Sequence, residues 1–109
     1  MTQLDVIRMI GDVLTEIDVA VGSLLPTDPD LVRLQDLRRL LDARQLALSR
    51  QLFEDNTEQF RNASARLKAV NDEIVGSIRR IDDLVTVIRN VTRFIDAVTS
   101  FMGTIGAVI

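Results

Sequence analysis

The sequence predicts an all-α protein, and three observations lead to that prediction. Apolar residues recur every seven positions through residues 53–109, and a companion apolar series, interrupted only by Ser77, runs between them. This alternating three-and-four spacing is typical of a helix that buries one seam against other helices. Pro26 and Pro29, the only prolines, stand close together between two amphipathic segments. Hydrophobic residues make up 47% of the 109 positions, enough to fill the core of a single helical domain spanning residues 1–109.

The first predicted helix covers about residues 2–25, and the second covers about residues 29–53. Both carry a stripe of apolar residues at helical spacing. Pro26 ends the first helix because proline lacks an N–H group and restricts the residue before it. Pro29 suits the first turn of the second helix, with Asp28 as its cap. A short link between two apolar-faced helices predicts an antiparallel helical hairpin.

The third predicted helix covers about residues 56–109, and the sequence leaves open whether it breaks near Gly76. Asp55 and Glu58 fit a capping box at its start. The unbroken seven-residue phase favours one long, coiled-coil-like C-terminal helix added to the hairpin. A turn at Gly76 would instead give an up-down-up-down four-helix bundle. In the long-helix case residues 81–109 extend past the hairpin, and their apolar stripe then requires a partner, since leaving such side chains in water is costly.

The predicted interaction surface is therefore the apolar side of the C-terminal segment. We expect this segment to self-assemble as a homo-oligomer or to dock a protein partner. Gly103 and Ala107 stand four residues apart, a spacing of small residues that lets helices approach closely. The pattern equally fits a helix surrounded by its own bundle or one that inserts into a membrane. The predicted interface residues are Ile81, Leu84, Ile88, Val91, Phe94, Ile95, Val98, Phe101, Met102, Gly103, Ile105, Ala107 and Ile109.

The residue types that the chain lacks exclude many functions. It has no Cys, His, Trp or Tyr. No thiolate or imidazole can therefore bind a metal or cofactor, act as a base near neutral pH or attack a substrate. The formal net charge of −3, with dispersed basic residues, argues against binding nucleic acid. We predict no enzymatic activity, no cofactor, no metal and no small-molecule substrate.

Carboxylate pairs and arginines are the remaining candidates for chemistry. The acidic pairs are Asp12 with Glu16, Asp72 with Glu73, and Asp82 with Asp83. All are expected on solvated helix faces, where Arg79 is predicted to pair with Asp83 at i,i+4 spacing. Arg89 and Arg93 share one helical face just before the apolar tail, a place from which they could contact phosphates or anionic lipid headgroups. Surface solvation is the expected role of these arginines as well.

One short motif resembles a known family. The run Pro-Thr-Asp-Pro-Asp-Leu at residues 26–31, between two amphipathic helices, resembles the hairpin turn of type III secretion needle subunits. The run Phe-Arg-Asn-Ala at residues 60–63 is similar to a segment of their second helix, although its spacing from the turn differs. Those subunits are small Cys-free helical hairpins that polymerise into hollow filaments. The resemblance implies filament-type assembly.

Three functional hypotheses follow. The leading one is a non-enzymatic structural or protein-interaction module that uses its C-terminal helix. The alternative is a membrane-active helical protein, pore-forming or bound to a lipid surface, and the third is a small inhibitor or immunity-type binding protein. The N-terminus lacks the features of a secretory signal, so we expect a cytoplasmic location or export by a non-classical route. The longest uncharged run, residues 97–109, is shorter than the about 20 residues of a membrane-spanning helix.

Overall fold

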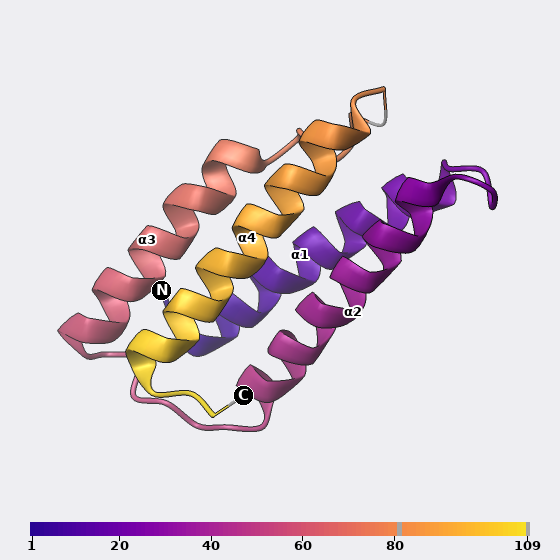
Figure 1. Ribbon diagram of the computed structural model, residues 1–109. Coiled ribbons are helices and arrows are strands. Elements are labelled where there is room, and N and C mark those ends of the chain that lie inside the picture. Colours follow the sequence, from indigo (N-terminus) through magenta and orange to yellow (C-terminus); the bar gives the residue numbers. More distant parts are fainter. Residues whose placement is uncertain (81, 109) are drawn as a thin grey trace.

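Four α-helices make up the computed structural model, which describes residues 1–80 and 82–108. They are α1 (Gln3–Gly22), α2 (Pro29–Ser49), α3 (Glu58–Ile74) and α4 (Leu84–Ile105). The chain direction alternates from one helix to the next (Figure 1), and the bundle measures 45 × 24 × 17 Å. The all-α class and the four-helix alternative of the sequence prediction are therefore confirmed.

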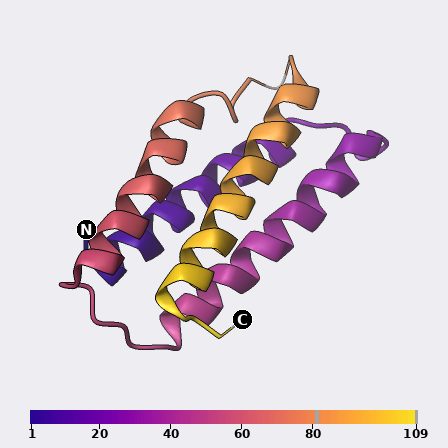
Figure 2. The ribbon, with the colours of Figure 1, turned by 60° about the vertical axis from the view of Figure 1, so that its left-hand side comes forward.

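The helices form two antiparallel pairs that lie against each other. α1 packs on α2, α3 packs on α4, and α2 also packs on α4. The two helices α2 and α4 run in the same direction, so the link between α2 and α3 crosses one end of the bundle to reach the other pair (Figure 2). α4 consequently contacts two other helices of the same chain, which is how its wide apolar side is covered.

The α1–α2 turn follows the prediction closely. Asp28 caps α2, with its side chain accepting a hydrogen bond from the Asp30 backbone N–H at 2.9 Å and with Pro29 in the first turn. The C-terminal ends of both helices come three or four residues earlier than predicted, at Gly22 and Ser49. The sequence places apolar residues beyond both ends, and these belong to the connecting segments rather than to further helical turns.

The start of α3 differs from the predicted capping box. Thr57, not Asp55, caps the helix, and its hydroxyl accepts the Phe60 backbone N–H at 3.1 Å. Asp55 instead accepts a hydrogen bond from the backbone N–H of Gln3 at 2.8 Å and ties the connecting segment to the start of α1. A capping-box pattern read from sequence cannot anticipate this tertiary bond, which spans fifty-two positions along the chain.

A break after Ile74 corrects the long C-terminal helix that the sequence favoured. α3 ends at Ile74 and α4 begins at Leu84, and Gly76 adopts a left-handed conformation with φ of 84°. Side chains with a Cβ rarely adopt that conformation, so Gly76 is the residue that permits the reversal. An antiparallel turn imposes no phase on the two helices that it joins. The continuing seven-residue spacing of apolar residues is therefore compatible with a break. Ile74 and Ile88 both face the core, but from different helices.

Three contacts hold the segment between α3 and α4 against the bundle. The Ile78 side chain is buried in the core. The Asn90 amide of α4 donates to the Ser77 hydroxyl at 2.9 Å. Arg79 forms an ion pair with Glu16 of α1, in which Nη2 lies 2.6 Å from Oε1. The predicted ion pair of Arg79 with Asp83 is therefore wrong, because residues 79 and 83 lie in a turn rather than in one helix and the Arg79 side chain pairs with Glu16 of α1 instead.

The hydrophobic core combines side chains from all four helices. The largest fully buried side chains include Ile10 and Ile17 of α1, Leu41 of α2, Phe60 of α3 and Phe94 of α4. At one end, the Phe60 ring meets the ring of Phe101 edge to face, with their centroids 5.4 Å apart. This pair of rings fastens the start of α3 to the last turns of α4.

Candidate interaction site

Most of the predicted interface residues lie in the chain's own core. Their places fall into four groups. Ile88, Val91, Phe94, Ile95, Val98, Phe101 and Met102 are buried; Leu84, Ile105 and Ala107 are partly buried against the core; Gly103 is exposed; and Ile81 and Ile109 lie outside the described residues. The need for burial that motivated the interface is thus met by α2 and α3. A partner could reach the buried set only if the bundle opened.

The small residues near the C-terminus do not mediate close helix packing within the chain. A Cβ built on Gly103 would have no neighbouring heavy atom within 4 Å. Gly106 has a φ of 79° and ends α4 in a left-handed cap, and the Ala107 N–H then donates to the Met102 carbonyl at 2.8 Å. Gly106 and Ala107 thus end the helix, and Gly103 lies exposed in its last turn, so the spacing of Gly103 and Ala107 marks no close contact between helices of the chain.

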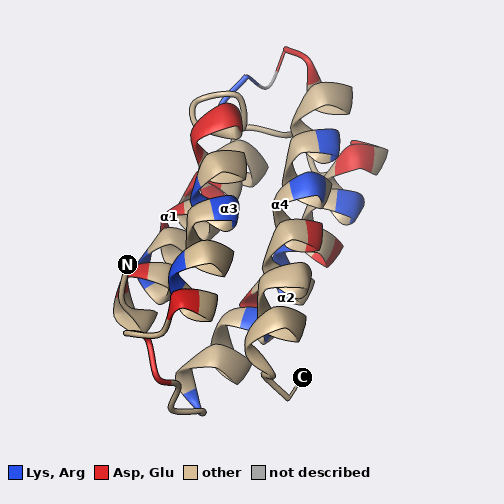
Figure 3. Cartoon of the chain, turned by 90° about the vertical axis from the view of Figure 1, so that its left-hand side faces the viewer, with Lys and Arg blue, Asp and Glu red and all other residues tan. Residues whose placement is uncertain are grey.

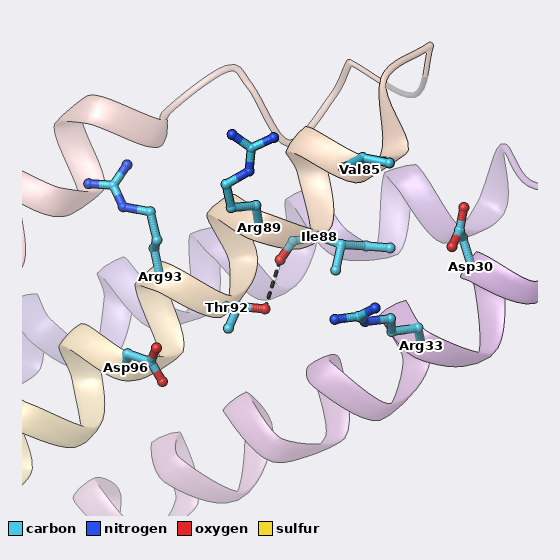
Figure 4. Close-up of a pocket in the computed structure, with 8 residues that line it drawn as sticks. All are labelled: Asp30, Arg33, Val85, Ile88, Arg89, Thr92, Arg93 and Asp96. Atoms are coloured by element: carbon cyan, nitrogen blue, oxygen red, sulfur yellow. Dashed lines mark hydrogen bonds between the residues drawn. The ribbon is translucent and has the colours of Figure 1, made fainter.

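The outer side of α4 contributes instead to a groove beside α2. Figure 4 shows this groove, which has a volume of about 380 Å³ and opens between the N-terminal halves of the two helices. The groove is lined by Asp30 and Arg33 of α2 and by Val85, Ile88, Arg89, Thr92, Arg93 and Asp96 of α4.

The groove has an apolar wall with basic groups beside it. Val85 and Ile88 extend from α4 towards α2, and the Arg33 guanidinium reaches from α2 towards Thr92 (Figure 4). Val85 remains 71% exposed, whereas Ile88 is buried at the base. The Thr92 hydroxyl donates to the Ile88 carbonyl at 2.8 Å, so its oxygen retains acceptor capacity while its proton is engaged.

The arginines of the groove differ in their partners. Arg93 pairs with Glu73 of α3, with Nη2 2.7 Å from Oε2. Arg33 and Arg89 form no ion pair with any described residue. Asp30 and Asp96 lie nearer the two ends of the groove, as Figure 4 shows. Arg33 and Arg89, which line the groove and form no ion pair with a described residue, are therefore the strongest hydrogen-bond donors beside it for an external ligand.

The acidic pairs from the sequence do not come together as a reaction centre. Asp72 pairs with Lys68 at 2.7 Å, and Figure 3 shows acidic and basic residues distributed over the outer faces of the helices. The hydrogen bonds from Arg79 hold the pKa of Glu16 below its ordinary value. The pKa of Asp83 is lowered by hydrogen bonds from Thr86 at the start of α4. Both carboxylates are ionised structural anchors near neutral pH.

Two glutamines have structural roles that the sequence reasoning missed. The Gln3 side chain donates to the Leu48 carbonyl at 2.9 Å and accepts the Phe53 N–H at 3.0 Å. The Gln51 side chain accepts the Val108 N–H at 2.9 Å and donates back to the Val108 carbonyl. Together they tie the α2–α3 link to both ends of the chain. No periodic pattern marks such residues, since a side-chain amide can pair with any exposed peptide group.

Comparisons with known proteins add no match: no family model, no curated protein and no solved structure resembles this chain significantly. Among the described residues, no acidic cluster is arranged to hold a metal ion. Within the same part of the chain, every helix is too short or too polar to cross a bilayer.

Proposed function

We propose that the protein is a non-enzymatic interaction module whose α2–α4 groove docks an acidic, apolar segment of a partner protein. The observation that carries this proposal is one groove whose apolar wall is exposed at Val85 and whose lining includes two arginines, Arg33 and Arg89, that pair with no described acidic residue. The proposal keeps α4 as a docking helix. It moves the contact from the core side of α4 to its outer, N-terminal half.

Charge and shape together define the partner. Arg33 and Arg89 can each bind a carboxylate through two parallel N–H donors, an arrangement that lysine cannot reproduce. Val85 would gain from burial, because more than two-thirds of its surface is exposed to water. Asp30 and Asp96 would repel carboxylates at the ends of the groove and so restrict them to its middle. A volume of about 380 Å³ accommodates a few side chains of a peptide segment.

A short fluorescein-labelled peptide of alternating Glu and Leu tests the proposal by fluorescence anisotropy. We expect the wild-type protein to bind it, with affinity falling as salt is added. A peptide with Lys in place of Glu should not bind. The double variant Arg33→Glu/Arg89→Glu should weaken binding by about tenfold or more, since two attractions become repulsions.

The matched control is Arg8→Glu/Arg66→Glu, which changes the net charge equally at exposed positions of α1 and α3. An equal loss of affinity in both double variants would mean that only net charge matters, and the groove assignment would be wrong. Vesicles containing phosphatidylglycerol provide the second arm. Tighter binding to these vesicles than to the peptide, abolished by Arg33→Glu/Arg89→Glu, would replace the protein partner with a lipid surface.

A further inference from the structure

The outward side of α2 carries apolar side chains although it contacts no other helix of the bundle. Val32, Leu40 and Leu46 are 58%, 40% and 47% exposed, and Ala43 between them is exposed as well. The opposite side of the same helix is fully used, with Leu34 and Leu41 buried among their neighbours in the core. Exposed apolar side chains on a second side of a helix, here among the charges of Asp36, Arg39 and Arg50, suit a further contact on that side.

Two charges on this outward side, Asp36 and Arg50, are placed symmetrically about Ala43, whereas Arg39 has no charged counterpart. Asp36 lies seven residues before Ala43, and Arg50 lies seven residues after it, with opposite sign. Leu40 and Leu46 lie three residues before and after it. Seven residues are close to two helical turns, so Asp36, Ala43 and Arg50 fall along one line on the helix surface. Arg50 caps α2 with helical backbone angles, which keeps its side chain on that line.

Such a pattern is complementary to itself when a second helix runs in the opposite direction. A two-fold axis through Ala43 would place Asp36 opposite Arg50 of the second copy, and the reverse pair would form at the other end. The small Ala43 side chains would meet at the centre and allow the helix axes to approach closely. Leu40 would then pack on Ala47 of the second copy.

We propose that the outward side of α2 binds a second copy of the chain as an antiparallel, two-fold symmetric homodimer centred on Ala43. Charge complementarity argues for a second copy as the occupant, because Asp36 of each copy lies opposite Arg50 of the other when the two α2 helices run antiparallel. Within one chain, Arg39 reaches Asp36 at 2.9 Å while both side chains remain largely exposed. Arg50 forms no ion pair with a described residue. In the dimer, Asp36 would contact both Arg39 of its own chain and Arg50 of the second copy.

Sedimentation equilibrium up to about 1 mM protein tests the dimer, a range that detects micromolar dissociation constants. One helix against one helix makes an interface at the small end of the usual range, so dimerisation should depend strongly on concentration. Ala43→Glu puts two carboxylates at the centre and should abolish the dimer. Ala43 is exposed on a helix, so this variant is expected to fold, and its unfolding temperature checks that it does.

Charge reversal tests the register. Asp36→Arg alone and Arg50→Glu alone should each weaken dimerisation by about tenfold, because each turns two attractive pairs into two repulsive ones. The double variant Asp36→Arg/Arg50→Glu restores opposite charges in both pairs across the interface and should recover most of the lost affinity, although the Asp36–Arg39 pair within each chain stays broken. Asp12→Arg is the control for Asp36→Arg: it makes the same change in net charge on the side of α1 that faces α3, and should have no effect.

A wild-type protein that stays monomeric over this range would overturn the inference. So would a dimer that persists in Ala43→Glu, or a double variant that remains as weak as the single ones. The inference goes beyond the proposed function, since Arg33 and Arg89 lie outside the symmetric set. The Ala43→Glu variant should bind the acidic peptide as the wild type does. The dimer and the peptide-binding groove are therefore tested separately, and either proposal can fail without the other.

Discussion

The contact between Phe60 and Phe101 provides a direct test of the fold-back after Ile74. The two rings meet edge to face at 5.4 Å, with an interplanar angle of 81°, and they belong to α3 and α4. Aromatic pairs in this geometry contribute about 0.5–1.5 kcal/mol beyond the burial of their surfaces. In one continuous helix the same residues would lie about 60 Å apart and could not interact.

A double-mutant cycle measures this interaction. Phe60→Leu, Phe101→Leu and the double variant are compared with the wild type by urea unfolding followed by circular dichroism. Each single change is expected to lower the free energy of unfolding by about 0.5–3 kcal/mol, because both rings are buried. The double variant should lose about 0.5–1.5 kcal/mol less than the sum of the single losses, since the ring–ring contact is lost only once.

A control cycle combines Phe60→Leu with Val85→Ala, which is exposed in the first turn of α4, and α4 begins at the end of the bundle opposite the start of α3. Its effects should add within about 0.3–0.5 kcal/mol, as they do for distant sites. If the Phe60–Phe101 cycle is equally additive, the antiparallel packing of α3 on α4 is refuted.

Further predictions concern the turns and the pH dependence. Gly76→Ala should lower the free energy of unfolding by about 1–2 kcal/mol because of its φ of 84°, and an unchanged thermal midpoint would contradict the turn. Gly103→Ala should raise stability by up to about 1 kcal/mol, since an added Cβ meets nothing within 4 Å; a loss would indicate close helix contact there. Arg79 lowers the pKa of Glu16 in the folded state. The ion pair therefore stabilises the fold at pH values above the ordinary carboxyl pKa, and this stabilisation is lost as the pH falls through the lowered pKa of Glu16 in the folded protein. Glu16→Gln should therefore flatten the acid side of the stability–pH curve, and an identical curve would mean that the ion pair contributes nothing.

Much of the architecture was predictable because it depends on local rules. Paired prolines and an Asp cap fix the α1–α2 turn, and helical periodicity identifies the core sides of α1 and α4. The break at Gly76 was not decided by the same rules. A single glycine is tolerated inside helices, and the seven-residue spacing of apolar residues continues unchanged across Gly76, so it did not indicate a turn. What favours the turn is tertiary: burial of Ile78, and the bonds of Ser77 and Arg79 to other helices.

The interaction surfaces were harder to predict than the fold. Periodicity identifies a side chain that must be buried, but not whether its partner lies within the chain or outside it. Ile88 and Phe94 satisfied the pattern of an interface and are buried in the bundle. The groove depends instead on Arg33 of α2 reaching towards Thr92 of α4, two positions that are far apart in sequence. Arg89 was identified as a candidate for phosphate or lipid contact, but its place in a groove beside an apolar wall was not.

Small-angle X-ray scattering of the Ala43→Glu variant tests the central claim, that the C-terminal half folds back and covers its own apolar seam. This variant is used so that self-association does not enlarge the particle. The account predicts a compact particle whose longest dimension is close to the 45 Å of the bundle, apart from the hydration layer. A continuous helix over residues 56–109 would be about 80 Å long. A maximum dimension near that length would contradict the account.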